Sequence, residues 1–177
     1  MNIDILKVGP LQANCYIVYQ DKKCLVIDPG DDENFIVSRI KRLELEPVAI
    51  LITHNHFDHN KVAKPLSSIY NVPIYDFNNL FEQEHFLDPF RFKVIYTPGH
   101  SKDSICFYFT EYKIMFTGDF LFHEDIGRVD LPGGDTDEMM SSIRKITEYD
   151  DDIQIFPGHD KKTTLKHEKE NNPYFLN

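Results

Sequence analysis

Four short apolar segments of this chain end in turns that carry histidine or aspartate, and this recurrence limits how the chain can fold. The segments 50–52, 94–96, 114–116 and 155–156 lead directly into the turns 53–59, 97–100, 117–119 and 157–159. Short apolar runs that stop at turn residues are typical of buried β-strands, and loops beyond rigid strand ends can converge on one cleft. Glycine beside several of the polar residues leaves backbone freedom and space for a ligand. We therefore expect the fold to gather these strand ends in one place.

The turns supply seven candidate metal ligands, and their number predicts more than one ion. Imidazole and carboxylate groups suit zinc, with iron or manganese as alternatives. Seven ligands exceed what one tetrahedral ion can use, so the set predicts two ions that share a bridging ligand. Five of the eight histidines lie in these turns, which argues against a chance distribution. The candidates are His54, His56, Asp58, His59, His100, Asp119 and His159.

The order of the predicted elements indicates an α+β fold. Apolar, β-branched runs predict a hairpin at 14–19 and 24–27 and a second hairpin at 105–109 and 113–116. Apolar residues at helical spacing predict helices at 34–43, 62–70, 136–149 and 164–170, with Asp135 as the N-cap of the third. Further strands are expected at 48–52, 73–75, 92–96 and 153–156. Because strands cluster in each half and helices are interspersed, we expect two packed sheets with helices outside.

Length, charge and cysteine content narrow the class of protein. A chain of 177 residues predicts one domain that spans residues 1–177. No apolar run approaches the roughly 20 residues that span a membrane, and the first residues lack the parts of a signal peptide, so we expect a cytoplasmic protein. Cys15, Cys24 and Cys106 form no Cys-x-x-Cys pair and are expected to be buried, reduced thiols. A formal net charge of −10 would repel nucleic acid and anionic membranes, so neither is an expected partner.

The histidine and aspartate motifs together resemble those of the metallo-β-lactamase superfamily. The resemblance rests on the segment THNHFDH at 53–59 followed by the turns at His100, Asp119 and His159, and it covers nearly the whole chain. The segments GDFLF at 118–122 and GRVDLPGG at 127–134, with the end of the chain from PGH at 157–159, are similar to short bacterial glyoxalase II-like hydrolases. The resemblance implies a four-layer αββα sandwich, in which two mixed sheets lie face to face with helices outside.

The resemblance also implies how the candidate ligands divide between two ions. Three histidines would hold the first ion, three other residues would hold the second, and one aspartate would bridge both. These groups are His54, His56 and His100; Asp58, His59 and His159; and Asp119. An aspartate at the bridging position resembles the hydrolase branches of the superfamily more than its antibiotic-degrading class B β-lactamases.

Two departures from the family pattern concern the substrate more than the chemistry. The first motif is followed by NKVA at 60–63, where small residues are usual, and His100 is followed by SKDS at 101–104, where the family turn is rich in glycine and proline. Neither change removes a ligand. The additional C-terminal helical region that helps full-length glyoxalase II grip glutathione is missing, so glutathione specificity does not carry over.

The expected reaction is hydrolysis of a small thioester or ester. Two ions about 3.5–4 Å apart can hold a bridging hydroxide at neutral pH, and that hydroxide would attack the acyl carbon. Asp58 and Asp119 would orient it, and the first ion would polarise the carbonyl. A thiolate leaves with little proton assistance, because a free thiol has a pKa of about 8.5. We expect a small acyl-thiol or ester as the partner and make no prediction of the oligomeric state.

Several other functions fit parts of the pattern. A persulfide dioxygenase has the same fold that the resemblance implies, but it uses one iron held by two histidines and an aspartate. The complete second ligand set therefore favours hydrolysis. Lactonases and β-lactamases attack other activated carbonyls with the same hydroxide. Nucleases of the superfamily carry extra clamping domains, for which this chain is too short and too acidic. A non-catalytic binding module is disfavoured because no ligand is missing.

Four polar residues outside the ligand set have open roles. Arg128 with Asp130 could contact an anionic substrate, and a structural pairing that pins the surrounding loop is at least as good an interpretation. His123 could line the mouth of the cleft, although a plain surface position is the more common role. His167 lies in the charged last helix and is expected to be solvated.

Overall fold

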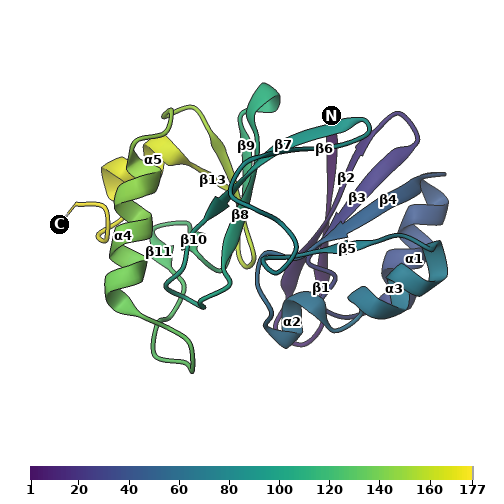
Figure 1. The fold of residues 1–177 in the computed structure, drawn as a ribbon, viewed down its shortest axis with the longest axis horizontal. Helices are drawn as coiled ribbons and strands as arrows, with labels where there is room; N and C mark the ends of the chain where they lie inside the picture. The colour runs from purple at the N-terminus through teal and green to yellow at the C-terminus, as the bar shows by residue number, and fades with distance from the viewer. Residues whose placement is uncertain (177) are drawn as a thin grey trace.

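Two mixed β-sheets form the centre of the structure, a computed structural model that describes residues 1–176 (Figure 1). The first sheet contains five strands in the spatial order β1 (Asn2–Val8), β2 (Ala13–Gln20), β3 (Lys23–Ile27), β4 (Glu46–Leu51) and β5 (Ile74–Tyr75). The second sheet contains six strands in the order β13 (Thr163–Thr164), β12 (Gln154–Pro157), β9 (Ile114–Gly118), β8 (Ile105–Phe109), β7 (Phe90–Tyr96) and β6 (Glu84–Leu87). Each sheet combines antiparallel hairpins with parallel pairs, as expected for mixed sheets.

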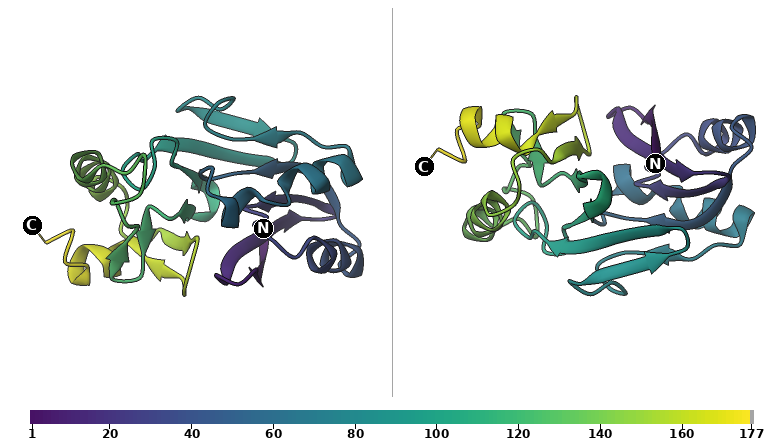
Figure 2. Two further views of the ribbon diagram at one scale, coloured as in Figure 1. Left: turned by 90° about the horizontal axis from the view of Figure 1, so that it is seen from below. Right: turned by 90° about the horizontal axis from the view of Figure 1, so that it is seen from above.

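Helices cover the outer face of each sheet. Figures 1 and 2 show α1 (Glu33–Arg42) and α3 (Ala63–Tyr70) beside the first sheet, and α4 (Thr136–Thr147) and α5 (Leu165–Asn171) beside the second. The shorter elements are α2 (Phe57–Asn60), the 3₁₀ turn η1 (Thr110–Tyr112) and a small hairpin of β10 (Leu121–Phe122) and β11 (Asp125–Ile126). The four-layer αββα sandwich is therefore confirmed. None of the helices within residues 1–176 has the length and apolar character to cross a membrane.

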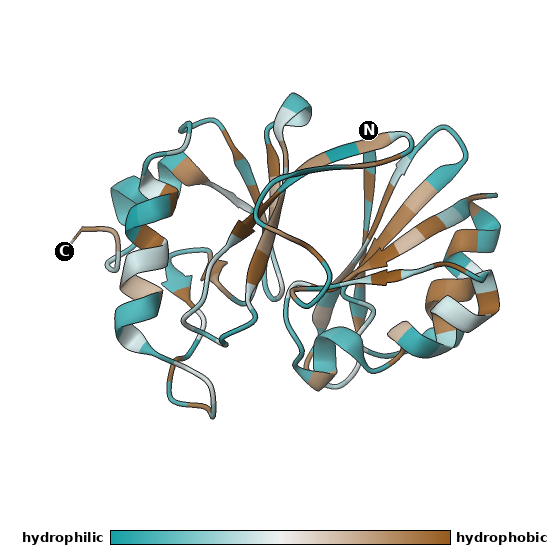
Figure 3. Ribbon diagram, viewed as in Figure 1, coloured by the Kyte–Doolittle hydropathy of each residue, from teal (hydrophilic) through white to brown (hydrophobic). Residues whose placement is uncertain are grey.

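The alternation of side chains along the strands explains the layers. In β2, Tyr16 and Val18 face the space between the sheets, whereas Cys15 and Ile17 pack against the helices outside. Strand side chains point to opposite faces with a period of two, so a strand buried on both faces must be apolar at every position. The same alternation in β8 and β9 divides their residues between the central core and the layer under α4 and α5. Figure 3 shows this concentration of hydrophobic residues on the strands.

Aromatic rings fill much of the space between the sheets. The ring of Phe116 lies 4.9 Å from that of Tyr16 and 5.4 Å from that of Phe156, measured between centroids. Phe107 and Phe109 extend the cluster on the same sheet. Edge-to-face and tilted aromatic pairs of this kind add to the stabilisation from burying apolar area. The core therefore joins the two sheets into one packed unit.

Most of the predicted elements are present. Most of the strands that the prediction missed are short. Both hairpins and the four helices form close to the expected bounds, and Asp135 caps α4 by accepting hydrogen bonds from the backbone amides of Asp137 and Glu138 at 2.9 and 3.0 Å. The three cysteines are buried and unpaired. Strands β1, β6, β10, β11 and β13 were not predicted. Except for β1, they have four residues or fewer, too few for a periodic pattern to be read from sequence.

Strand direction brings the ligand-bearing turns together. β3 and β4 are parallel neighbours, as are β9 and β12, so the carboxyl ends of each pair lie at one edge. β7 runs in the direction of β9 because both are antiparallel to β8. Across the sheets, the Tyr16 hydroxyl donates to the carbonyl of Pro157 at 2.5 Å, and the amide of Ile105 donates to the carbonyl of Thr53 at 2.9 Å. These bonds hold the carboxyl ends of the strands of one sheet beside those of the other.

The central core can be tested at Phe116. We expect Phe116→Ala to lower the free energy of unfolding by about 3–5 kcal/mol, because the fully buried ring would leave a cavity between the sheets. Urea unfolding of the metal-free protein measures the loss. Phe81→Ala is the control, since Phe81 is 70% exposed, and should change stability by less than about 1 kcal/mol. Similar losses in the two variants would contradict this account of the core.

Candidate metal centre

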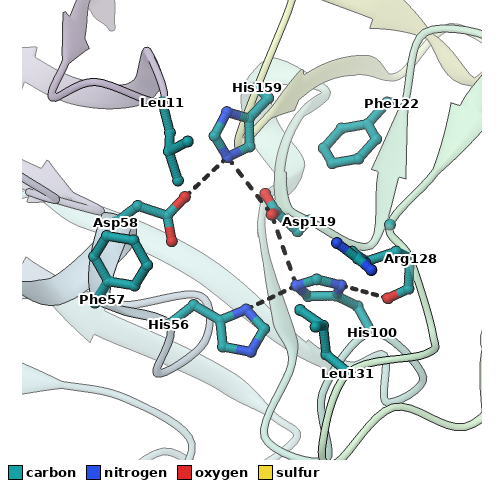
Figure 4. Close-up of a pocket in the computed structure, with 11 residues that line it drawn as sticks. Leu11, His56, Phe57, Asp58, His100, Asp119, Phe122, Arg128, Leu131 and His159 are labelled. Carbon is teal, nitrogen blue, oxygen red and sulfur yellow. Dashed lines mark hydrogen bonds and ion pairs between the residues drawn. The ribbon is translucent and has the colours of Figure 1, made fainter.

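All seven sequence-predicted ligands meet beside one cavity at the carboxyl ends of the strands. His56, Asp58, His100, Asp119 and His159 line this cavity, which has a volume of about 500 Å³, and Figure 4 shows their side chains pointing into a common space. His54 and His59 lie beneath it and are almost fully buried. The turns after β4, β7, β9 and β12 and the short helix α2 supply these residues. The structure thus brings the seven side chains together. That they bind metal stays a prediction.

Three imidazoles form the first group. The Nδ1 atom of His56 lies 3.1 Å from Nε2 of His54 and 2.9 Å from Nε2 of His100. The three rings face one another nearly at right angles, with centroids 4.6 to 5.0 Å apart. Three nitrogen lone pairs can thus be directed at one point, which is the donor arrangement that zinc prefers.

The second group lies on the other side of Asp119. His159 Nε2 is 3.2 Å from Oδ2 of Asp58, and His59 Nε2 is 3.6 Å from the same oxygen. Asp119 has one oxygen 3.3 Å from His59 Nε2, and its other oxygen is 3.6 Å from His159 Nε2 and 3.7 Å from His100 Nε2. This carboxylate therefore faces both groups, as a bridging ligand must.

Hydrogen bonds to the outer nitrogens fix which atom of each ring faces the cavity. His100 Nδ1 lies 2.8 Å from the carbonyl oxygen of Arg128, and His59 Nδ1 lies 3.0 Å from a carboxylate oxygen of Asp28. Neither oxygen can donate, so each Nδ1 must carry a proton and Nε2 is the nitrogen available to a ligand in the cavity. Outer partners of this kind orient metal-binding histidines and raise their basicity.

Asp28 is a residue of this site that the sequence reasoning missed. Its buried carboxylate accepts hydrogen bonds from the Thr53 amide at 2.8 Å, from the Thr53 hydroxyl at 2.6 Å and from His59. The Thr53 hydroxyl, having donated its proton, can accept from Nδ1 of His54 at 3.1 Å. One carboxylate therefore orients a histidine of each group. The signal was present, because IDPG at 27–30 also places an aspartate directly after an apolar strand.

Two buried polar atoms indicate that a cation fits between the groups. Nε2 of His59 and Oδ1 of Asp119 have no hydrogen-bond partner within the described part of the chain. Buried polar atoms without a partner are costly, and a shared metal ion would satisfy both. Gly158 keeps the space open, because a Cβ there would lie 2.2 Å from Oδ1 of Asp119 and 2.6 Å from Cε1 of His59. The residues therefore fit a divalent metal ion.

The titration behaviour of the groups agrees with this fit. Burial lowers the pKa of His54 well below its ordinary value and also lowers that of His56, so both rings are neutral near pH 7. Burial opposes ionisation of Asp119, but the nearby charge of His59 lowers its pKa. Burial likewise opposes the charge on His59, and the carboxylates of Asp119 and Asp28 raise its pKa well above the ordinary value. A cation bound by His59 and Asp119 must displace that proton. The affinity for metal should therefore decrease as the pH is lowered.

The second departure from the family pattern, SKDS at 101–104, ties together two loops that carry predicted ligands. Asp103 accepts hydrogen bonds from the Asn55 backbone amide at 3.1 Å and side-chain amide at 2.7 Å. The hydroxyl of Ser101 donates to the other oxygen of Asp103 at 2.7 Å and lies 2.8 Å from that of Ser104. These polar residues thus hold the loop of His56 against the loop of His100.

The cavity has a polar base and apolar walls. Leu11, Phe57, Phe122 and Leu131 form the walls, and Leu11 and Phe57 are more than half exposed. Arg128 also lines the cavity, but its guanidinium donates two hydrogen bonds of 2.7 Å to Asp130. A few polar groups within apolar walls are typical of sites for small organic ligands.

The chain is similar in sequence and structure to metal-dependent hydrolases. The family model described as the metallo-beta-lactamase superfamily matches residues 8–80 and 73–159. The hydroxyacylglutathione hydrolase GloC of Haemophilus influenzae is 37% identical over all of this chain and 99% of that protein. Two crystal structures are each 30% identical to the chain: the BLEG-1 B3 metallo-beta-lactamase, with a TM-score of 0.96 over 99% of this chain and 100% of the other, and TTHA1623 in a di-iron-bound form, with a TM-score of 0.90 over 97% and 99%.

The role of Asp28 can be tested without substituting any of the predicted ligands. We expect Asp28→Asn to weaken zinc binding by about 10–100-fold, because the neutral amide orients His59 and Thr53 less strongly. Competition with a chromophoric chelator measures the affinity. Asp21→Asn is the matched control, since Asp21 is exposed and has nearly the same backbone φ, 53° against 52°. Equal affinities in the two variants would show that Asp28 does not support the centre.

Proposed function

This chain belongs to the metallo-beta-lactamase superfamily and is a metallo-hydrolase of that group, and we propose that it cleaves a small thioester of the hydroxyacylglutathione type. The proposal rests on one observation: both ligand groups are complete and converge with Asp119 at the base of an apolar-walled cavity. The 37% sequence identity to a hydroxyacylglutathione hydrolase, over all of this chain and 99% of that protein, supports this substrate class.

We propose two Zn²⁺ ions per chain as the cofactor. His54, His56 and His100 would hold one, Asp58, His59 and His159 the other, and Asp119 would contact both. When bound, such ions supply a deprotonated water at neutral pH and a positive charge for a developing oxyanion. The same donors also suit iron, which the related TTHA1623 structure contains.

The side chains of the cavity determine how a substrate would be placed. Asp58 and Asp119 present carboxylate oxygens to the cavity, where they can accept hydrogen bonds from the attacking water and orient it toward the acyl carbon (Figure 4). Phe57 and Leu131 offer apolar contact for the acyl group or the thiol carrier. The thiolate can depart without a protein proton donor, because a thiolate is a much weaker base than an alkoxide. Serine or cysteine nucleophiles have no role in this scheme.

The direct test is the release of D-lactate from S-D-lactoylglutathione. We expect the zinc-loaded protein to release D-lactate and the metal-stripped protein to be inactive, with activity restored by adding zinc. Absence of release from a protein shown to hold two ions would reject the hydroxyacylglutathione substrate. Iron-loaded protein should be assayed for oxygen uptake with glutathione persulfide, because uptake would instead support a persulfide dioxygenase.

Asp119 is the residue whose loss should affect both metal content and turnover. We expect Asp119→Ala to lose metal and to lower kcat/KM by more than the roughly 10–100-fold expected from loss of an outer partner. Metal analysis and the thioesterase assay measure the two effects. Asp137→Ala, an exposed change in the first turn of α4, should leave both unchanged. Full activity of Asp119→Ala would exclude its bridging role.

Hydrolysis of β-lactams is a second candidate function. It is favoured by the TM-score of 0.96 and 30% identity to the BLEG-1 B3 metallo-beta-lactamase over nearly all of both chains. An exposed cavity with apolar walls also suits a bicyclic amide. A chromogenic cephalosporin assayed beside the thioester separates the two activities, since the ratio of the two kcat/KM values identifies the preferred carbonyl.

A further inference from the structure

A second cluster of metal-binding side chains lies outside the candidate metal centre. His123 and Glu124 form the turn between β10 and β11, and His167 lies on α5. One donor atom from each of these residues lies within 4.8 Å of the others. His167 is 43 positions from Glu124 in sequence, but the three residues meet where the hairpin contacts the C-terminal helix. We name them the hairpin–helix cluster.

The donor atoms of the cluster lie close enough together to share one ion. Oε1 of Glu124 lies 2.8 Å from Nε2 of His167 and 3.7 Å from Nε2 of His123. The two imidazole rings are stacked, with centroids 4.8 Å apart and 29° between their planes. Two imidazoles on one tetrahedral zinc ion, with Zn–N distances of about 2.0–2.1 Å, have centroids roughly 5 Å apart. The hydrogen bond from His167 lowers the pKa of Glu124, so its carboxylate is ionised near pH 7.

We propose that His123, Glu124 and His167 form an additional binding site for a zinc-like divalent ion. Two imidazoles and one carboxylate are a common ligand set for Zn²⁺, and the partial exposure of all three side chains leaves a fourth position for water. This inference does not depend on the proposed thioesterase function.

Buried hydrogen bonds hold the cluster in place without the ion. Glu168, which is fully buried, accepts from the backbone amide of Glu124 at 2.8 Å, from the Thr163 hydroxyl at 2.6 Å and from the Asn172 side chain at 2.9 Å. Glu168 thus joins the hairpin turn to α5 at the residue next to His167. A site that is already assembled loses less entropy when it binds its ligand.

The cluster is separate from the catalytic cavity but is connected to its wall. His123 and His167 line a different cavity of about 430 Å³, which shares none of the residues that line the first. Phe122, next to His123, lines the catalytic cavity, and its ring lies 6.2 Å from that of His159. An ion in the cluster would therefore fasten α5 to the hairpin that carries one wall of the active site.

Neighbouring charges indicate that this ion binds after the other two. Lys161 and Lys162 line the same cavity as His123 and His167, and their positive charges oppose a cation. The cluster also offers three ligands, whereas the candidate metal centre offers seven. We expect zinc to fill the candidate metal centre first and the hairpin–helix cluster at higher free concentration.

The test is the number of zinc ions bound per chain at saturation. Wild-type protein should bind one more ion than a His123→Gln/His167→Gln double variant, measured by elemental analysis after equilibration in zinc buffers. His85→Gln is the matched control, because His85 is a partly exposed histidine in β6 and should leave the count unchanged. Glu124→Gln should weaken the last ion at least tenfold while keeping a hydrogen-bond acceptor for His167.

Thermal unfolding provides a second measurement. Raising zinc beyond the level that fills the candidate metal centre should raise Tm in wild type and His85→Gln but not in the double variant. Equal metal-free Tm values for these proteins would show that the double variant is folded. The same zinc count and the same Tm response in wild type and the double variant would overturn the proposal, whatever the thioesterase assay shows.

Discussion

The hydrogen bonds of the buried Asp28 carboxylate are the interaction on which the rest of the site depends. A charged carboxylate is expensive to bury, and here it is satisfied by the amide and hydroxyl of Thr53 and by His59. Thr53 and His59 follow β4, while Asp28 follows its parallel neighbour β3, so the network also joins two strand ends. The direction of its hydrogen bonds sets the tautomer of His59 and orients His54. A single ionised group thereby links the packing of the first sheet to the chemistry of the cavity.

The sandwich supplies the other half of the centre. His100, Asp119 and His159 follow strands of the second sheet, so the site exists only because aromatic packing holds the two sheets face to face. Direct bonds between the sheets, such as that from Tyr16 to Pro157, lie next to these ligands. Rigid strands on both sides allow short polar loops to place donor atoms within a few ångströms. The same arrangement leaves an open cavity above the donors, and its apolar walls are contributed by loops and by the β10–β11 hairpin.

In our proposal, the β10–β11 hairpin also carries two ligands of a further metal site. Phe122 faces the catalytic cavity, while the next two residues face α5 and, in our proposal, a further ion. Substrate selection and metal availability would then act on the same short element. The apolar walls and the paired Arg128 and Asp130 leave few free charges near the mouth of the cavity, which fits a substrate recognised mainly by shape and by its carbonyl.

The sequence by itself predicted two packed sheets with helices outside, most of the long elements and the seven side chains that converge, because periodic apolar runs and abrupt polar turns are local patterns. The αββα order of the layers was implied by the resemblance of its motifs to a known family. Asp28 was overlooked although it follows an apolar strand, and the pairing of His123 and Glu124 with His167 has no local signature in the sequence. Short strands such as β10 and β11 were also missed, because two residues carry no period. Tertiary structure alone decided which strand ends are adjacent and hence which nitrogen of each histidine faces the cavity. The physical reason is that hydrogen bonds between distant segments, such as His59 to Asp28 and His100 to Arg128, depend on sheet pairing that no short stretch of sequence encodes.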